Sequence, residues 1–165
     1  MIIPMPKKEY ITIQMNPEHS SRYQVLTGAL LERQQSDRSY LAACYLLSAD
    51  DEIFDIAKPY VSFDGIDFAA IRMRVKKRFG TYNEYTAIEV GYSLFTWRDC
   101  KVNPHEMAQS GPFWLPIICN ALLIQGNAAN VEVAEWKPCV MQLYPKPVIW
   151  RIVDFARNNI KRDGK

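Results

Sequence analysis

The hydrophobic pattern of the chain begins with a two-residue period and then changes to a helical one. Residues 10–15 alternate apolar and polar side chains, which is typical of a short, half-buried strand. Residues 16–18, Asn-Pro-Glu, supply a capping oxygen, a proline suited to the first helical position and a carboxylate that the helix dipole favours. We therefore expect a helix to begin there, with apolar residues at spacings of three and four, and to be closed by polar residues 33–36.

The next segment, about residues 38–48, is apolar on every side, which predicts a central helix packed all round. Asp37 is placed to cap it. Three carboxylates at 50–52 then precede a short helix that ends near Ala57. We interpret them as capping residues rather than as a metal site, because no further carboxylate or histidine motif points toward them.

The segment from 67 to 80 fits two interpretations. As a helix it has apolar residues at spacings of three and four, with Asp67 as its cap and Gly80 placed to end it. As a strand, its apolar residues from Ile71 onward alternate with cations. We favour the helix because both of its ends carry suitable residues. Either way, five cations fall within seven residues: Arg72, Arg74, Lys76, Lys77 and Arg78.

Further helices are predicted in the middle of the chain. Thr81 is expected to cap a long, largely buried helix that runs to about Trp97. Residues 103–104, Asn-Pro, open only one or two turns. Residues 113–125 form a last core helix, which Gly126 is placed to end.

The last part of the chain is expected to contain extended pieces and one more helix. Residues 131–133 and 139–143 are predicted to be extended and could pair with residues 10–15. Residues 149–160 form the cleanest amphipathic pattern in the chain. Three cations on or beside the polar face of that predicted helix are further candidate binding residues: Arg151, Arg157 and Lys161.

Together these elements predict a mainly α fold, a compact helical domain of about six helices with a possible small β element. The composition agrees, since 48% of the 165 residues are apolar and 23% are charged, as in an ordinary globular domain. We expect residues 1–165 to be a single domain, with a helical core at 16–126 and a C-terminal extension at 127–165 that carries the amphipathic helix.

The charge is small overall but uneven along the chain. The net charge is +2, whereas residues 1–70 carry −4 and residues 71–165 carry +6. This layout could steer an acidic partner to one face, although a fold that neutralises one half against the other is the simpler interpretation.

Cysteine and histidine spacing indicates no metal site and no cofactor, because no Cys-x-x-Cys pair is present. Cys44 and Cys119 lie in apolar helical segments and are expected to be buried, while Cys100 and Cys139 lie in polar surroundings. Cys100 and His105 are close in sequence, but no third group suggests a catalytic pair. We expect both histidines, the other being His19, at the surface.

No segment is long and apolar enough to cross a membrane. The longest apolar run, Phe113–Ile124, has twelve residues and is interrupted twice. Residues 1–8 lack the charge order of a secretory signal, so we expect a cytoplasmic protein.

Residues 16–53, together with the helical segment 87–97, resemble a family of small bacterial and phage proteins known only as a domain of unknown function. In that family, Glu-His-x-x-Arg-Tyr is followed by a helix of the type Asp-Arg-x-x-Leu-Ala-x-x-Tyr-Leu-Leu-Ser and an acidic turn; these motifs occur here at 18–23 and 37–48. The resemblance covers about residues 16–126. It implies a mostly helical fold encoded by mobile elements or Gram-positive genomes, with no established activity. The basic segment 63–80 departs from the family pattern.

The function that we expect is a non-catalytic binding or regulatory protein that docks onto a protein partner, such as a modulator of a host system, with a homodimer as the simpler outcome. Nine tyrosines, four tryptophans and six methionines are residue types that anchor interfaces, and Trp114, Trp136 and Trp150 are the first candidates. The alternative is a nucleic-acid-binding module that uses the basic cluster 72–78. An enzyme ranks last, because no phosphate-binding loop or catalytic motif is present.

Overall fold

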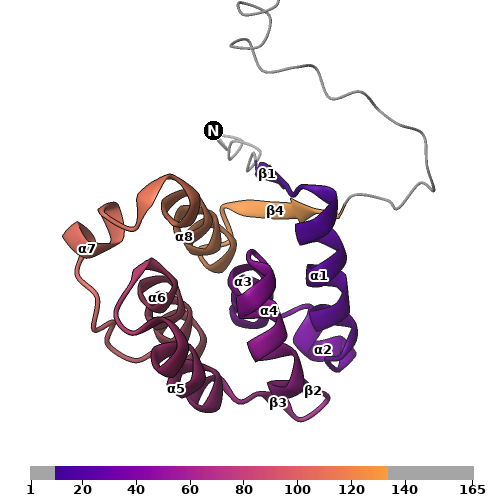
Figure 1. Cartoon of the computed structure of the whole chain (residues 1–165). Helices are drawn as coiled ribbons and strands as arrows, with labels where there is room; N and C mark the ends of the chain where they lie inside the picture. The colour runs from indigo at the N-terminus through magenta and orange to yellow at the C-terminus, as the bar shows by residue number, and fades with distance from the viewer. Residues whose placement is uncertain (1–9, 134–165) are drawn as a thin grey trace, which may run out of the picture. The chain divides into compact units, whose positions relative to one another are not determined.

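The computed structural model describes residues 10–133, all within the first of two units into which the chain divides, Met1–Ala134. The elements along this part of the chain are β1 Ile11–Gln14, α1 Pro17–Gly28, α2 Glu32–Gln35, α3 Arg38–Leu47, α4 Asp51–Ala57, the 3-10 turn η1 Lys58–Tyr60, β2 Val61–Ser62, β3 Gly65–Ile66, α5 Phe68–Phe79, α6 Asn83–Thr96, α7 Pro104–Ala108, α8 Gly111–Gln125 and β4 Ala129–Glu132 (Figure 1). The predicted mainly helical domain is confirmed.

The described part has eight α-helices rather than about six, because short helices are included in the count. The helices α2, α4 and α7 have four, seven and five residues, respectively. Two predicted boundaries were wrong. Residues 33–36 do not simply close the first helix, since α1 ends at Gly28 and most of that polar stretch forms α2. Thr81 does not cap α6, which begins at Asn83 with the extended residue Tyr82 before it.

The central helix of the described domain is α3, as its pattern predicted. It contacts α1, α6 and α8 and lies between them in Figure 1. Every residue from Ala42 to Leu47 is buried. Because apolar side chains project from α3 in all directions, the surrounding helices bury their inward faces against this one helix.

Capping side chains start the helices where the sequence predicted. Asn16, Asp37, Asp50, Asp67 and Asn103 each accept a hydrogen bond from a backbone N–H in the first turn of the helix that follows. The capping interpretation of residues 50–52 is confirmed for Asp50, and the two following carboxylates lie in the first turn of α4. These bonds satisfy donors that have no partner within the helix.

The segment at 67–80 is a helix, which decides between the two interpretations in favour of α5. Gly80 ends it with a φ of 68°, a left-handed conformation that glycine adopts readily. The residues Phe68, Ile71 and Val75 are buried against the core. The five cations therefore occupy the remaining faces of one helix.

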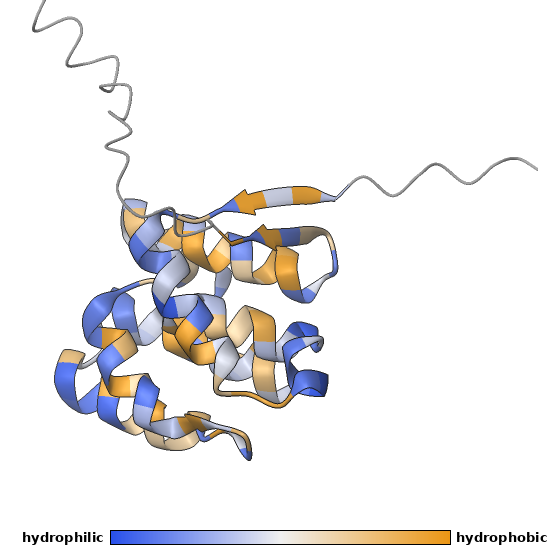
Figure 2. Cartoon of the chain, turned by 90° about the vertical axis from the view of Figure 1, so that its right-hand side faces the viewer, coloured by the Kyte–Doolittle hydropathy of each residue, from blue (hydrophilic) through white to orange (hydrophobic). Residues whose placement is uncertain are grey.

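Two short strands join the ends of the described segment. β1 and β4 pair in parallel, with Ile11 opposite Ala129 and Ile13 opposite Val131, and they lie side by side in Figure 2 with apolar and polar residues in turn. The predicted pairing of 10–15 with 131–133 is confirmed. The guanidinium of Arg38 donates to the Ala129 carbonyl at 3.1 Å, which ties β4 to α3. The predicted strand at 139–143 and helix at 149–160 lie outside the described residues, and the single-domain expectation for 1–165 stays a prediction.

None of the helices within residues 10–133 has the length and apolar character needed to cross a membrane.

The helices α3, α5 and α6 meet at Gly91. A Cβ built there lies 3.0 Å from Leu46 Cδ1 and 3.0 Å from Phe68 Cζ, which is closer than side chains normally approach. Both neighbours are themselves fully buried. The small residue on α6 therefore permits the close approach that packs α5 and α6 onto the central helix.

We expect Gly91→Ala to destabilise the fold by about 1–3 kcal/mol through overpacking, in spite of the higher helix propensity of alanine. The control is Gly28→Ala, at an exposed helix position with nothing within 4 Å of the added methyl. Thermal melts of both variants check this, and equal melting temperatures would contradict the tight packing at Gly91.

Candidate functional site

The five cations of α5 lie within seven residues of one helix, and four of them lie close to aromatic rings. The cation lies within cation–π distance of a ring in the pairs Arg72–Tyr92 at 4.8 Å, Arg74–Tyr60 at 5.2 Å, Lys76–Tyr85 at 5.6 Å and Arg78–Phe79 at 5.7 Å. We call these five cations with their four rings the cation–aromatic face. The sequence predicted the cations, whereas their pairing with rings on α6 and η1 required the fold.

Helical spacing divides the cation–aromatic face into two flanks. The side chains of Arg72 and Lys76, four residues apart, lie toward rings of α6, while Arg74 lies over a ring of η1. Met73 is 71% exposed between these flanks. An exposed thioether is thus bordered by cations on both sides.

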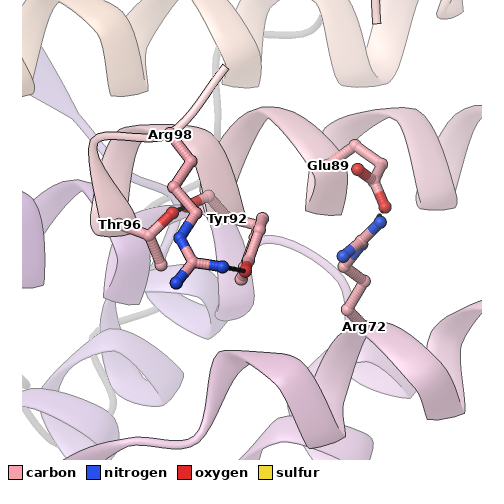
Figure 3. Close-up of polar contacts among 5 residues, drawn as sticks. All are labelled: Arg72, Glu89, Tyr92, Thr96 and Arg98. Atoms are coloured by element: carbon pink, nitrogen blue, oxygen red, sulfur yellow. Dashed lines mark hydrogen bonds and ion pairs between the residues drawn. The ribbon is translucent and has the colours of Figure 1, made fainter. Parts of the chain in front are cut away.

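Arg72 also forms an ion pair with Glu89 across the α5–α6 contact (Figure 3). The Glu89 side chain is only 2% exposed, and that of Arg72 is 23% exposed. The hydrogen bond to Glu89 raises the pKa of Arg72. A buried carboxylate without a partner is costly, and Arg72 supplies the opposite charge to Glu89 at the contact between α5 and α6. A charged residue within the apolar stretch 87–91 was the sequence signal for this pair, and our sequence analysis missed it.

The other flank borders a groove of about 760 Å³ between α4, η1 and α5. Its lining includes Glu52 and Asp55 as well as Arg74, Lys77 and Arg78. One ion pair crosses it, from Arg78 to Glu52 at 2.9 Å, with both side chains more than half exposed. An exposed pair of this kind contributes little stability, so both groups remain available to a partner.

A second feature that the sequence analysis missed lies at the end of α6. Trp97 caps the helix in the left-handed region, with a φ of 59° and a ψ of 25°, and is 82% exposed. The Ser93 hydroxyl donates to the Arg98 carbonyl at 2.5 Å. The Arg98 guanidinium donates to the Tyr92 hydroxyl at 3.2 Å (Figure 3). These bonds hold the turn in which Trp97 stands. Left-handed backbone at a bulky residue is rare and strained, so this position resembles strained functional sites in other proteins.

Trp114, one of the first candidate interface anchors, is only 4% exposed, on the inward side of α8, so it is not available to a partner. Its neighbour Phe113 is 49% exposed instead, and the two rings meet edge to face at 5.0 Å. The prediction for Trp114 was wrong because the helical phase of an almost wholly apolar segment does not reveal which side faces the core. Trp136 and Trp150 lie outside the described residues.

His19 is buried, contrary to our expectation, and belongs to a network that joins α1 to the end of α3. Its Nε2 lies 2.9 Å from the Tyr45 carbonyl, and its ring packs against the Tyr45 ring at 4.7 Å. Arg22 donates to the carbonyls of Ser48 and Ala49 at 2.8 and 3.0 Å, which satisfies the C-terminus of α3. The residues that carry the family resemblance therefore form a helix-to-helix contact.

The cysteines of the described chain show no catalytic arrangement. Burial raises the pKa of Cys44 to about 12, so that thiol stays protonated. Cys100 is exposed as expected, but Cys119 is also exposed, because it lies on the outer side of α8 rather than in the core. Among residues 10–133 no group of three or more His, Cys, Asp or Glu side chains is placed to hold a metal ion. Cys139, Arg151, Arg157 and Lys161 lie outside the described residues.

Comparison with known proteins identifies no relative: no family model matches the chain, and no curated protein or solved structure matches it significantly. The resemblance over residues 16–126 stays a prediction.

The free energy of unfolding should decrease as the pH is lowered, because of His19. Burial lowers its pKa from the ordinary value of 6.5, Arg22 acts in the same direction, and the Tyr45 carbonyl opposes both. Below pH 6.5 the unfolded chain takes up a proton that the folded chain does not, so stability decreases until the pH passes the lowered value. The slope is at most about 1.4 kcal/mol per pH unit.

Chemical denaturation of the wild type and His19→Gln at pH 7.5, 6.5 and 5.5 measures this effect. Gln places an N–H donor near the Tyr45 carbonyl without titrating, so the variant should lose less stability over this range. Parallel pH profiles for the two proteins would exclude His19 as the source.

Trp97→Gly is expected to stabilise the fold by about 1 kcal/mol, since glycine accepts the left-handed conformation without strain. For a chain of this length that corresponds to a rise in melting temperature of about 2–4 °C. Trp97→Ala keeps the strained backbone and removes only the ring, so it should change stability by less than about 0.5 kcal/mol. A clear loss in both variants would mean that the indole packs against the fold.

Proposed function

We propose that the protein is a non-catalytic binding protein that docks onto the acidic surface of another protein through its cation–aromatic face. The observation that carries the proposal is the set of four cation–π pairs around exposed Met73. Arginine, tyrosine and methionine are enriched at protein interfaces, and arginine and tyrosine often supply most of the binding energy.

Preorganisation supports a docking function. A long cationic side chain loses rotamer freedom when it binds a partner, which costs about 0.5–1.5 kcal/mol for each side chain. Here rings restrict Arg74 and Lys76 before any partner arrives, and both residues remain exposed. Part of the loss of side-chain rotamer freedom has therefore already occurred in the free protein.

Local charges favour a protein over a nucleic acid as the partner. A phosphate backbone needs a track of cations, whereas Glu52 and Asp55 line the groove beside Arg74 and Lys77. Glu89 compensates the charge of Arg72. Exposed Met73 adds an apolar contact that phosphates do not use. Mixed charges around an apolar centre suit a protein surface better.

A different protein is the favoured partner rather than a second copy bound through the same face. In a symmetric dimer each face meets its own copy, so the cations of α5 would oppose one another. The resemblance to proteins of mobile elements supports a modulator of a host system as the particular activity.

The test is affinity capture from the native host with three immobilised proteins, with and without nuclease. The first is the wild type, and the second carries Arg74→Glu and Lys77→Glu. The third is a control with the same change in charge just after the C-terminal end of α6, and it carries Arg98→Glu and Lys101→Glu. We expect one protein species to be retained by the wild type and the control, lost with the α5 variant and unaffected by nuclease.

The species is then identified by mass spectrometry and its affinity measured with purified protein, where the α5 variant should bind at least tenfold more weakly. Equal capture by all three proteins would contradict the proposal. Material that disappears with nuclease would favour the nucleic-acid alternative.

A further inference from the structure

We infer that the turn after α6 is a binding site for a nucleoside phosphate, with the base stacked on Trp97 and the phosphate held by Arg98 and Lys101. The site lies at the C-terminal end of α6. The inference does not depend on the protein-docking proposal.

The first support is the placement of Trp97. Its indole is 82% exposed although its backbone holds a left-handed conformation that glycine would adopt without strain. No stability argument within the fold calls for a tryptophan at this position. An exposed aromatic ring is what base stacking requires, and stacking accepts any nucleobase.

The second support is the charge around the indole. Trp97 borders a depression of about 500 Å³ whose lining includes Arg72, Tyr92, Arg98, Asp99 and Lys101. That volume is in the range of small-molecule sites. Because Glu89 pairs with Arg72, the charges left to bind an anion are those of Arg98 and Lys101, opposed only by Asp99.

The third support is the fixed geometry of the turn. Tyr92 is the centre of it: its hydroxyl accepts from Arg98 at 3.2 Å, its ring lies under Arg72, and its carbonyl accepts from the Thr96 hydroxyl at 2.7 Å (Figure 3). The bond to the Tyr92 hydroxyl draws the Arg98 guanidinium toward Tyr92, and its remaining N–H groups suit the oxygens of a phosphate. The Asp99 carboxylate can accept from a ribose hydroxyl or a base amino group.

A nucleoside phosphate fits this combination better than a protein side chain does. An aromatic anchor of a protein interface is normally surrounded by further apolar contacts that exclude water. Around Trp97 the lining is instead cationic and polar. A ligand that is aromatic at one end and anionic at the other satisfies both kinds of group.

Isothermal titration of the full chain tests the inference, with adenosine 5′-monophosphate as the probe and adenosine and ribose 5-phosphate as its two halves. We expect the whole nucleotide to bind at least tenfold more tightly than either half. Trp97→Gly should weaken binding at least tenfold while the melting temperature is kept or raised. Trp97→Tyr should retain most of the affinity, since it restores a stacking ring.

Two further variants separate this site from the cation–aromatic face. Arg98→Gln with Lys101→Gln should reduce nucleotide affinity to that of adenosine, whereas Arg74→Glu with Lys77→Glu should leave it unchanged. If the wild type binds the nucleotide but captures no protein partner, the docking proposal fails and this inference stands. If it captures the partner but does not bind the nucleotide, this inference fails and the docking proposal stands.

A tetranucleotide of thymidine with a 5′-phosphate distinguishes the source of the ligand. Tighter binding of the single nucleotide identifies a free nucleotide as the ligand, and tighter, Trp97-dependent binding of the oligonucleotide identifies a nucleic-acid end. The inference is overturned if no nucleotide binds at 5 mM, or if binding is the same in Trp97→Gly as in the wild type.

Discussion

The ion pair between Arg72 and Glu89 is the interaction on which both proposed binding surfaces depend. Glu89 lies inside the contact between α5 and α6, where its side chain is only 2% exposed, so its charge must be compensated from the neighbouring helix. Arg72 provides that charge and lies over the ring of Tyr92 at the same time. The pair therefore joins the two helices at the place where the cations of α5 meet the rings of α6.

The two proposed binding surfaces on α5 and α6 differ in their chemistry. Along α5, cations flank one exposed thioether and lie near rings contributed by neighbouring elements, an arrangement that suits a broad protein surface. At the end of α6, one exposed indole on a strained backbone position borders a small depression lined by polar groups, which suits a compact ligand. Stability alone explains neither feature. A solvated cation requires no aromatic ring beside it. A helix that only has to end is stabilised better by glycine at its C-terminus.

Much of the fold could be predicted because its signals are local. A capping oxygen acts within three residues of its own position, so Asn16, Asp37 and Asp67 indicated where helices begin, and Gly80 indicated where α5 ends. The presence of apolar residues on every side identified α3 as the central element. The predictions for Trp114 and Cys119 failed for the opposite reason, since α8 is apolar on nearly all sides and its pattern does not say which side the core will cover.

By itself, the sequence determined the type and approximate limits of most helices and the presence of five cations on one of them, because backbone hydrogen bonding and hydrophobic period act over a few residues. Only the tertiary structure decided which rings those cations meet, that Glu89 and His19 are buried, and that Trp97 stands exposed beside Arg98. The exposed turn at Trp97 is held by hydrogen bonds within residues 92–98. The ring partners of Arg72, Arg74 and Lys76 and the burial of Glu89 and His19 depend instead on contacts between residues distant in the chain, such as His19 with Tyr45 or Arg74 with Tyr60. Such contacts arise from the packing of whole helices, and no local pattern of residues encodes them.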